Sequence, residues 1–206
     1  MKRCVVVGGA DINDYARIRS RIRRDDFVIF CDSGLKHMAP LGSKPGLIVG
    51  DFDSYSDPHL DVETITLPTE KDDTDSVFAV KEALKRGFDD FLLIGAAGGR
   101  LDHTLGNISI LLYLDSLGKN ACLIDDYSEM EIVSRCPARV DGSFSYFSLL
   151  NISGTARGIT IKDAKYPLDG AEITCEYQYG ISNEVLPGKT ALITVREGRL
   201  LLVKVF

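Results

Sequence analysis

The chain contains the stretch FLLIGAAGGRLDH at residues 91–103, in which an apolar run leads through a glycine-rich turn to an Arg, an Asp and a His. The apolar run is typical of a buried strand, and residues 105–117 have the pattern of an apolar helix that Gly118 would stop. Glycines let backbone N–H groups approach a phosphate, and the amino end of a helix adds positive potential. The stretch therefore predicts a strand–loop–helix unit whose loop could face a phosphate, although the P-loop and dinucleotide spacings are both absent.

Similar units lie on both sides of this stretch. Helical patterns are expected at residues 15–23 and 72–86, and Gly87 is placed to end the second. Further apolar runs predict strands at residues 5–7, 27–30, 47–49, 62–67 and 121–124. Strands that alternate with helices at this spacing form a mostly parallel sheet covered on both faces, so we expect an α/β domain over residues 1–126.

The pattern changes after Tyr127. Short strand-like runs separated by Gly-centred turns follow, at residues 131–133, 144–150, 159–161, 172–175, 191–195 and 200–205. This spacing is typical of a small antiparallel sandwich or barrel. The predicted fold class is therefore α/β, with an N-terminal, mostly parallel α/β sheet domain followed by a C-terminal antiparallel β-sandwich domain at residues 127–206.

The composition excludes several classes of protein. Hydrophobic residues make up 45% and charged residues 26% of the 206 residues, as in ordinary globular proteins. The net charge of −6 disfavours a nucleic-acid partner. The first apolar run is too short for a signal peptide or a membrane span, and the five cysteines form no C-x-x-C pair. We therefore expect a cytoplasmic protein without a membrane or nucleic-acid partner.

Four acidic clusters each follow an apolar run, and they begin at Asp32, Asp51, Asp72 and Asp102. Because open α/β sheets bind ligands at the carboxyl ends of their strands, we expect these clusters to form one site. Asp51 and Asp53 flank a single residue; in an extended chain both carboxylates would lie on one side and could share a divalent cation. A turn rich in Asp, in which Asp53 or Ser54 caps the next element, would explain the same residues.

The third cluster stands at the start of the predicted helix. Asp72 and Asp75 are three residues apart and would share a helix face, where they could reach a common ligand. Acids in a first turn also cap helices, so one or two of these residues could serve the helix instead. Lys71 beside them could neutralise phosphate charge.

The fourth cluster leaves two alternatives for each of its side chains. Arg100 could bind phosphate oxygens in a forked geometry, or Asp102 could hold it as a structural pair. His103 could take part in the site, or it could hydrogen-bond locally in a first helical turn. Taken together, a site with this many Asp residues, with basic side chains and glycine loops, suits Mg²⁺ and a polyphosphate.

At these residues the chain resembles the thiamin pyrophosphokinase family, over nearly its whole length. The matching stretches are GDFDS at 50–54, KDDTD at 71–75, GGRLDH at 98–103 followed by Asn107, KYPL at 165–168 and GISNE at 180–184. CDSG at 31–34 stands where the family usually shows Ala-Asp-Gly-Gly, so that Ser33 replaces a glycine. The resemblance implies an enzyme that moves a pyrophosphoryl group from ATP to the hydroxyethyl oxygen of thiamin and releases AMP. It also implies a homodimer whose thiamin pocket lies between one catalytic domain and the partner's β domain.

The resemblance also implies roles for single residues. The Mg²⁺ ligands would be Asp51, Asp53 and Asp75, with Asp32 and Asp72 close by, and either Asp51 or Asp75 would accept the thiamin hydroxyl proton. Arg100 and Asp102 would contact phosphates and help to fix the site, and Ser182 would contact the thiamin ring with Asn183 supporting its loop. The remaining residues expected on the nucleotide side are Lys71, Thr74, Gly98, Gly99, His103 and Asn107.

Two other functions remain as alternatives. A D-x-D after a strand is typical of haloacid-dehalogenase-type phosphatases, but these need Thr or Val two residues after the second Asp, and Tyr55 occupies that position. A non-catalytic sensor of nucleotide or thiamin could share the scaffold, but the acidic set and Arg100 are all present here.

Overall fold

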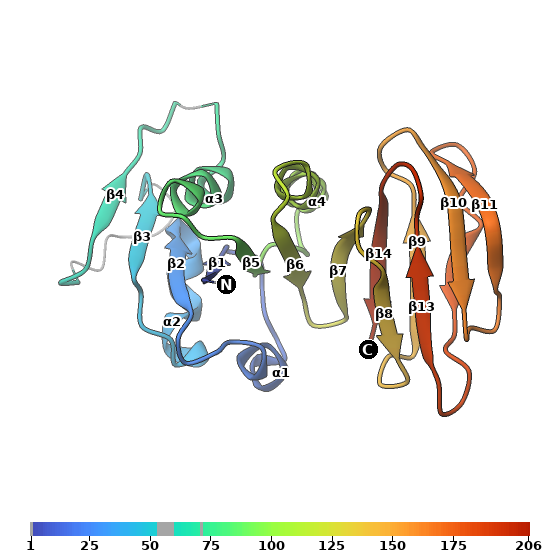
Figure 1. The fold of residues 1–206 in the computed structure, drawn as a ribbon. Helices are drawn as coiled ribbons and strands as arrows, with labels where there is room; N and C mark the ends of the chain where they lie inside the picture. The colour runs from blue at the N-terminus through green and yellow to red at the C-terminus, as the bar shows by residue number, and fades with distance from the viewer. Residues whose placement is uncertain (1, 53–59, 71) are drawn as a thin grey trace. The chain divides into compact units, whose positions relative to one another are not determined.

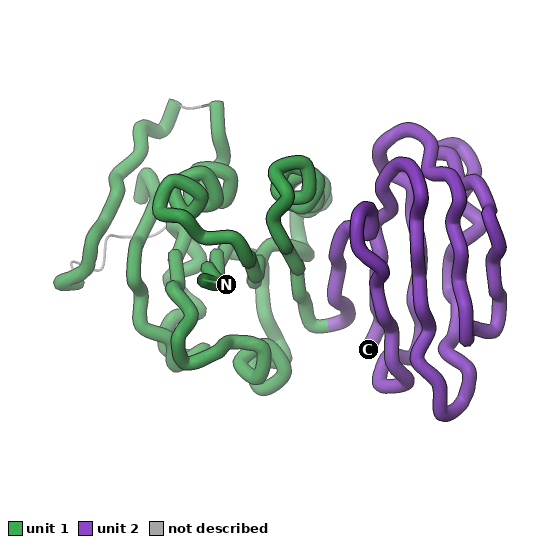
Figure 2. The backbone as a smooth tube through the Cα atoms, in the orientation of Figure 1, with its two compact units in different colours: residues 1–126 green, residues 127–206 purple. Residues whose placement is uncertain are grey.

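The structure is a computed structural model that describes residues 2–52, 60–70 and 72–206. The chain divides into two compact units, residues 1–126 and residues 127–206 (Figure 2). The first is a mostly parallel α/β unit and the second an antiparallel β unit, which confirms the predicted fold class. Among the described residues, no helix is long and apolar enough to cross a membrane.

The sheet of the first unit is parallel throughout (Figure 1). Its strands are β1 (Arg3–Val7), β2 (Phe27–Cys31), β3 (Leu47–Gly50), β4 (Thr64–Thr66), β5 (Asp90–Ile94) and β6 (Asn120–Ile124). They lie in the order β6-β5-β1-β2-β3-β4. The chain runs from β1 towards β4 and then returns to the other side of β1, so the direction of winding reverses between β1 and β5. This is the point at which such sheets open a crevice for a ligand.

Helices cover both faces of this sheet. On one face lie α1 (Tyr15–Ser20) and α2 (Met38–Leu41), and on the other lie α3 (Asp75–Lys85) and α4 (Leu101–Ser116) (Figure 1). A 3-10 helix, η1 (Asp32–His37), connects β2 to α2. Because both faces are covered, the central strands are apolar along their whole length: β3 is buried at every position, and β1, β2 and β5 are buried after the first residue.

Three predicted boundaries in this unit were wrong. The helix predicted at 72–86 begins at Asp75, because Thr74 has an extended backbone and its side chain accepts a hydrogen bond from Val77 N. The helix predicted at 105–117 begins four residues earlier, at Leu101, so that His103 does lie in a first turn. The helix predicted at 15–23 already ends at Ser20.

The second unit consists of two antiparallel sheets (Figure 1). One has the order β12-β9-β14-β7, with β12 (Gly180–Asn183), β9 (Tyr146–Leu150), β14 (Leu200–Val205) and β7 (Ser128–Val133). The other has the order β11-β10-β13-β8, with β11 (Leu168–Thr174), β10 (Thr155–Lys162), β13 (Thr190–Thr194) and β8 (Ala138–Asp141). Both sheets contribute to one apolar core that includes Phe147, Leu149, Ile161, Ile173, Ile193 and Leu202. The sequence pattern predicted neither β8 nor β12 as a strand.

Candidate active site

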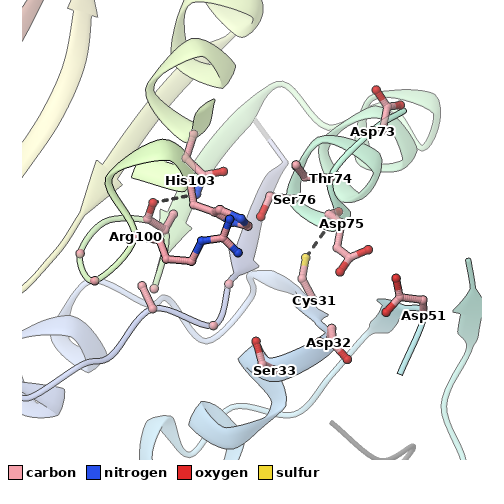
Figure 3. Close-up of a pocket in the computed structure, with 18 of the residues that line it drawn as sticks. Cys31, Asp32, Ser33, Asp51, Asp73, Thr74, Asp75, Ser76, Arg100 and His103 are labelled. Carbon is pink, nitrogen blue, oxygen red and sulfur yellow. Dashed lines mark hydrogen bonds between the residues drawn. The ribbon is translucent and has the colours of Figure 1, made fainter. Parts of the chain in front are cut away.

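A pocket of about 560 Å³ opens at the carboxyl ends of the strands of the first unit (Figure 3). Its wall includes residues that directly follow β1, β2, β3 and β5, together with the beginnings of α3 and α4. The predicted convergence of successive strand ends on one site is therefore what the fold produces. The pocket also lies at the reversal between β1 and β5, where the sheet topology favours a ligand.

Three carboxylates meet on one side of this pocket. Asp32, Asp51 and Asp75 each offer an oxygen atom, and these atoms lie within 4.8 Å of one another. Asp32 directly follows β2, Asp51 directly follows β3, and Asp75 is the first residue of α3. Figure 3 shows the three side chains turned towards a shared space. We refer to these three residues as the acidic cluster.

Backbone geometry explains how the cluster forms. Gly50 lies against Asp32: a Cβ atom at Gly50 would be 3.0 Å from Asp32 Cβ, so a larger residue would press the two strand ends apart. Asp32 has φ +35° and Phe52 has φ +58°, in the region that favours glycine. The chain therefore turns at Phe52, so it does not have the extended conformation on which the alternation argument for Asp51 and Asp53 depended. Asp53 itself lies outside the described residues.

The residues before α3 have separate positions. Asp72 precedes the helix and is exposed on the pocket wall, so the prediction that it shares a helix face with Asp75 was wrong. The Asp73 carboxylate is bound by Lys81, at 2.6 and 2.9 Å, and points away from the acidic cluster (Figure 3). Thr74 lines the pocket while its hydroxyl caps the helix. Lys71 lies outside the described residues.

The loop between β5 and α4, residues 95–100, forms another wall. Gly98 and Gly99 have φ +110° and +59°, which explains why glycine occupies both positions. The Gly98 N–H donates to the Thr104 hydroxyl at 3.1 Å, and the Asn107 side chain donates to the Ala96 carbonyl at 2.7 Å. Both bonds attach the loop to the first turns of α4, so Asn107 supports the pocket wall through Ala96.

Arg100 and Asp102 form an ion pair, one of the two alternatives left by the sequence. Arg100 Nη2 lies 2.6 Å from Asp102 Oδ2, and Nε lies 3.3 Å from Oδ1. The hydrogen bond from Arg100 lowers the pKa of Asp102 below its usual range. Both side chains are exposed, and such pairs are weakly held, so Arg100 can exchange this partner for a phosphate. Among the described residues the pocket wall includes Arg100 and His103 but not Asp102.

A second glycine loop, between β1 and α1 at residues 8–11, forms a further part of the pocket wall. A Cβ atom at Gly8 would lie 2.6 Å from the Gly95 carbonyl oxygen, so the two loops touch through their backbones. A Cβ atom at Gly9 would lie 1.9 Å from Ser33 Oγ, so the Ser33 side chain fills the space beside this glycine.

Some pocket residues were missed by the sequence reasoning. Asp11, Cys31 and Ser76 line the wall, and the first two could have been found because they follow or end strands that were already assigned to the site. The Cys31 thiol donates to the Asp75 carbonyl at 3.7 Å, and burial raises the pKa of this thiol. Cys31 therefore belongs to the support beneath the acidic cluster, with its thiol protonated.

The two predicted thiamin residues lie on β12 of the second unit. Ser182 is exposed with φ +57°, and its N–H donates to Ser148 Oγ at 3.1 Å. Asn183 is buried, and its side chain accepts from Tyr166 N at 3.0 Å and donates to Tyr166 O at 2.8 Å. Asn183 thus fixes the chain around Tyr166 next to β12.

Comparison with known proteins agrees with this architecture. The family model described as "Thiamin pyrophosphokinase, catalytic domain" matches residues 18–123, and "Thiamin pyrophosphokinase, vitamin B1 binding domain" matches residues 132–200. The chain is 26% identical over 212 residues to a thiamine pyrophosphokinase of Bacillus subtilis, covering 99% of each sequence.

Solved structures show the same likeness. A crystal structure of thiamine pyrophosphokinase from Bacillus subtilis superposes with a TM-score of 0.87 at 25% identity, covering 99% of both chains. Thiamin pyrophosphokinase from Geobacillus thermodenitrificans gives 0.84 at 26% identity, covering 100% of this chain and 98% of the other. The yeast thiamin pyrophosphokinase, at 14% identity and a TM-score of 0.74, covers 100% of this chain and 86% of its own, and shares the fold.

Proposed function

Because the chain belongs to the thiamin pyrophosphokinase family, we propose that it transfers the pyrophosphoryl group of ATP to the hydroxyethyl oxygen of thiamin, with Mg²⁺ as the metal. The observation that supports this reaction best is the acidic cluster at the strand ends, inside a pocket that also contains an arginine and two glycine loops. In the proposed reaction the thiamin hydroxyl oxygen attacks the β-phosphorus. The bond between the β-phosphorus and the bridging oxygen to the α-phosphate breaks, and AMP leaves with that oxygen. Asp51 or Asp75 accepts the hydroxyl proton.

The donor set of the acidic cluster fits Mg²⁺. This ion prefers oxygen ligands at about 2.0–2.1 Å in an octahedron, so two ligands of one ion lie at most roughly 4.2 Å apart. The cluster atoms lie within 4.8 Å of one another, so small side-chain rotations or a bridging water would complete the fit. Asp32, Asp51 and Asp75 would hold the ion, with Asp53 as a further proposed ligand. When bound, the ion would neutralise charge on the phosphate oxygens and help to orient them.

The protein's own groups would balance the remaining phosphate charge. Arg100 borders the pocket and can form a forked pair with phosphate oxygens once it leaves Asp102. The helices α3 and α4 both begin at the pocket wall, so their free N–H groups add positive potential there. We assign Lys71, Thr74, Gly98, Gly99 and His103 to the same nucleotide side.

For thiamin we propose a site that includes Ser182, supported by Asn183, in a homodimer that places this site at the subunit interface. The exposed Tyr177 and Tyr179 rings, 5.4 Å apart on the chain before β12, offer aromatic surface near Ser182. We also propose a cytoplasmic location, which suits five cysteines that are all free thiols.

The test is an assay with purified protein, ATP, thiamin and Mg²⁺, in which AMP and thiamin diphosphate are quantified together. We expect equimolar AMP and thiamin diphosphate, with neither formed when EDTA replaces Mg²⁺. Release of free phosphate alone would indicate a phosphatase, and binding of both ligands without product would indicate a sensor.

Matched variants connect this reaction to the acidic cluster. Asp75→Asn should lower the rate of AMP formation by roughly 10²-fold or more, because loss of even an outer-shell partner costs a metal site 10–100-fold. Asp73→Asn is the control, since it makes the same chemical change two residues away on a carboxylate that Lys81 binds. Equal rates for the two variants would refute the metal assignment.

A further inference from the structure

His37 is buried in the first unit, with 1% of its surface exposed, and both of its ring nitrogens have partners. Nε2 lies 2.9 Å from the Ala10 carbonyl oxygen, and Nδ1 lies 2.7 Å from the Tyr15 hydroxyl. A carbonyl oxygen can only accept, so Nε2 must carry a proton. Burial lowers the pKa of His37, against the opposing effect of the Ala10 hydrogen bond, so the ring is neutral near pH 7. Nδ1 then accepts from the Tyr15 hydroxyl, and the tautomer is fixed.

The Ala10 carbonyl belongs to the β1–α1 loop that lines the pocket. On one side this loop is held by the β5 end, because Gly8 N and Ala10 N donate to the carbonyls of Ile94 and Gly95 at 2.8 and 2.9 Å. On its other side the loop is held by the hydrogen bond from the buried His37 ring to the Ala10 carbonyl oxygen. Lys36 and Asp11 form a nearby ion pair at 2.7 Å. Because 88% of the Asp11 side chain is exposed, solvent screens this pair and it holds the loop only weakly.

His37 is the last residue of η1, the 3-10 helix that begins with Asp32 of the acidic cluster. Between these two ends η1 packs directly on the end of β1: a Cβ atom at Gly34 would lie 2.2 Å from the Val7 carbonyl oxygen. One six-residue segment thus carries a cluster carboxylate at its start and holds the β1–α1 glycine loop at its end. A shift of His37 would move the loop relative to Asp32.

The partner of His37 is itself fixed. Tyr15 is the first residue of α1, and Asp14 caps this helix by accepting from Arg17 N at 2.9 Å. The Asp126 carboxylate accepts from the N–H groups of Asn13 and Asp14 at 2.9–3.1 Å. The hydroxyl that hydrogen-bonds His37 Nδ1 therefore belongs to the capped start of a helix.

We propose that His37 is a positioning residue of the nucleotide pocket, which acts by holding the Ala10 carbonyl and thereby fixing the β1–α1 loop in the pocket wall that it shares with Asp32. Tyr15 supports it by donating its hydroxyl hydrogen to Nδ1, which satisfies the second ring nitrogen. This inference rests on the proposed function in one respect, that the ligand of the pocket is ATP. It adds two residues, neither of which lines the pocket in its described part.

The main test compares His37→Leu with His37→Gln. Leu removes the donor, whereas the Gln side-chain nitrogen stands the same number of bonds from the backbone as Nε2 and can donate to Ala10. For Leu we expect the Kd for Mg²⁺–ATP, measured by calorimetry without thiamin, to rise about tenfold, as for the loss of one buried hydrogen bond. We expect the same rise in the KM for ATP, whereas kcat and the KM for thiamin should stay within about twofold of the wild-type values. The Gln variant should remain within about threefold of wild type in all of these.

Leu41→Ala is the control for general loosening. Leu41 ends α2, directly after η1, and is 2% exposed, so its truncation should lower Tm while leaving the Kd for Mg²⁺–ATP unchanged. An equal rise in Kd in Leu41→Ala and His37→Leu would overturn the proposal, as would a folded His37→Gln protein that binds ATP no better than His37→Leu.

A spectroscopic measurement tests the mechanism even if His37→Leu does not fold. The ¹⁵N chemical shifts of the His37 ring should show a protonated Nε2 and an unprotonated Nδ1 in wild type, as the Ala10 carbonyl requires. A wild-type proton on Nδ1 would refute the proposal. Wild-type protein that binds ATP but forms no thiamin diphosphate would refute the proposed reaction and leave the binding and NMR tests of His37 valid.

Discussion

Asp51→Asn should make the ligand-free protein more stable while it removes the proposed activity. The acidic cluster places three carboxylates within 4.8 Å of one another, and like charges at this distance repel one another. Asp51 is the best residue for the test because it directly follows the strand β3. The charge of Asp75 is also stabilised by the positive potential at the start of α3, which would offset part of the repulsion. An amide keeps the shape of the carboxylate, removes its charge and replaces one acceptor oxygen by an NH2 donor.

The size of the effect follows from Coulomb's law. Two unit charges at 4.8 Å repel by about 0.9 kcal/mol in a water-like dielectric and by about 3.5 kcal/mol at an effective dielectric constant of 20. Asp51 takes part in two such pairs, and it is only half-buried, so solvent screening favours the lower value. We expect the free energy of unfolding to increase by about 1–2 kcal/mol, which corresponds to a rise in Tm of about 2–8 °C for a chain of this length.

The assay is thermal and urea unfolding of wild type, Asp51→Asn and Asp73→Asn, first with EDTA and then with Mg²⁺. Wild type should gain stability from the ion, by about 2.7 kcal/mol at a concentration 100 times its Kd. Asp51→Asn should lose most of this gain. Asp73→Asn should retain it, because its carboxylate is bound by Lys81 outside the cluster.

Two results would contradict this reasoning. If Asp51→Asn were less stable than wild type in EDTA, repulsion within the cluster would not be the main influence of this carboxylate on folding. If Mg²⁺ stabilised Asp51→Asn as much as wild type, the cluster would not be the site of the ion.

Three further outcomes are expected. Gly34→Ala should lower Tm and weaken ATP binding, because the new Cβ atom would lie 2.2 Å from the Val7 carbonyl oxygen. Gly106→Ala adds its Cβ atom in open space within α4, so it should raise the free energy of unfolding by about 0.5–1 kcal/mol. The stability of both variants is measured by thermal unfolding. Burial alone would raise the pKa of Asp126, but its hydrogen bonds from Asp14 and Asn13 lower it below the unfolded value. Asp126→Asn should therefore destabilise the protein at neutral pH, and the difference in urea unfolding should disappear as pH falls through about 4 and below the folded pKa. Ser182→Ala should raise KM for thiamin and leave KM for ATP unchanged in steady-state assays; a change in KM for ATP alone would contradict its assignment.

The convergence of the acidic cluster was predictable because it depends on chain order and on a topological rule. Each of Asp32, Asp51 and Asp75 stands directly after a strand or at the start of a helix, and parallel strands bring such positions to one edge. No side-chain detail is needed for this inference. The prediction therefore holds although the boundaries of α1, α3 and α4 were displaced by three or four residues.

The errors arose where several residues compete for one local role. In the stretch KDDTD any of Asp72, Asp73 and Thr74 could cap the helix, and the backbone at Thr74 decides which one does.

The strand β12 has the sequence GISN, in which Gly, Ser and Asn all have low strand propensity, and it pairs irregularly with β9. Its place is set by tertiary contacts such as those of Asn183, which a linear pattern does not contain.

His37 illustrates a further limit of sequence reasoning. Nothing in the local pattern distinguishes it from an ordinary surface histidine, because its partners lie 22 and 27 residues away. By contrast, His103 was singled out from its place in a glycine-rich motif, and it does line the pocket. Motifs mark residues that face a ligand, whereas the residues that hold those motifs in place are found only through contacts distant in sequence.

Three of the four strained non-glycine positions in the described part of the chain lie in the two proposed binding regions. Among the described residues, the non-glycine positions with positive φ are Asp32, Phe52, Asp163 and Ser182. Each costs of order 1–3 kcal/mol and persists only where surrounding contacts impose it. Asp32 belongs to the acidic cluster, Phe52 directly follows Asp51, and Ser182 is the residue proposed to meet thiamin. Local conformational preference is thus overridden at three positions of the proposed binding regions, and also at Asp163, which directly follows β10 and belongs to neither region.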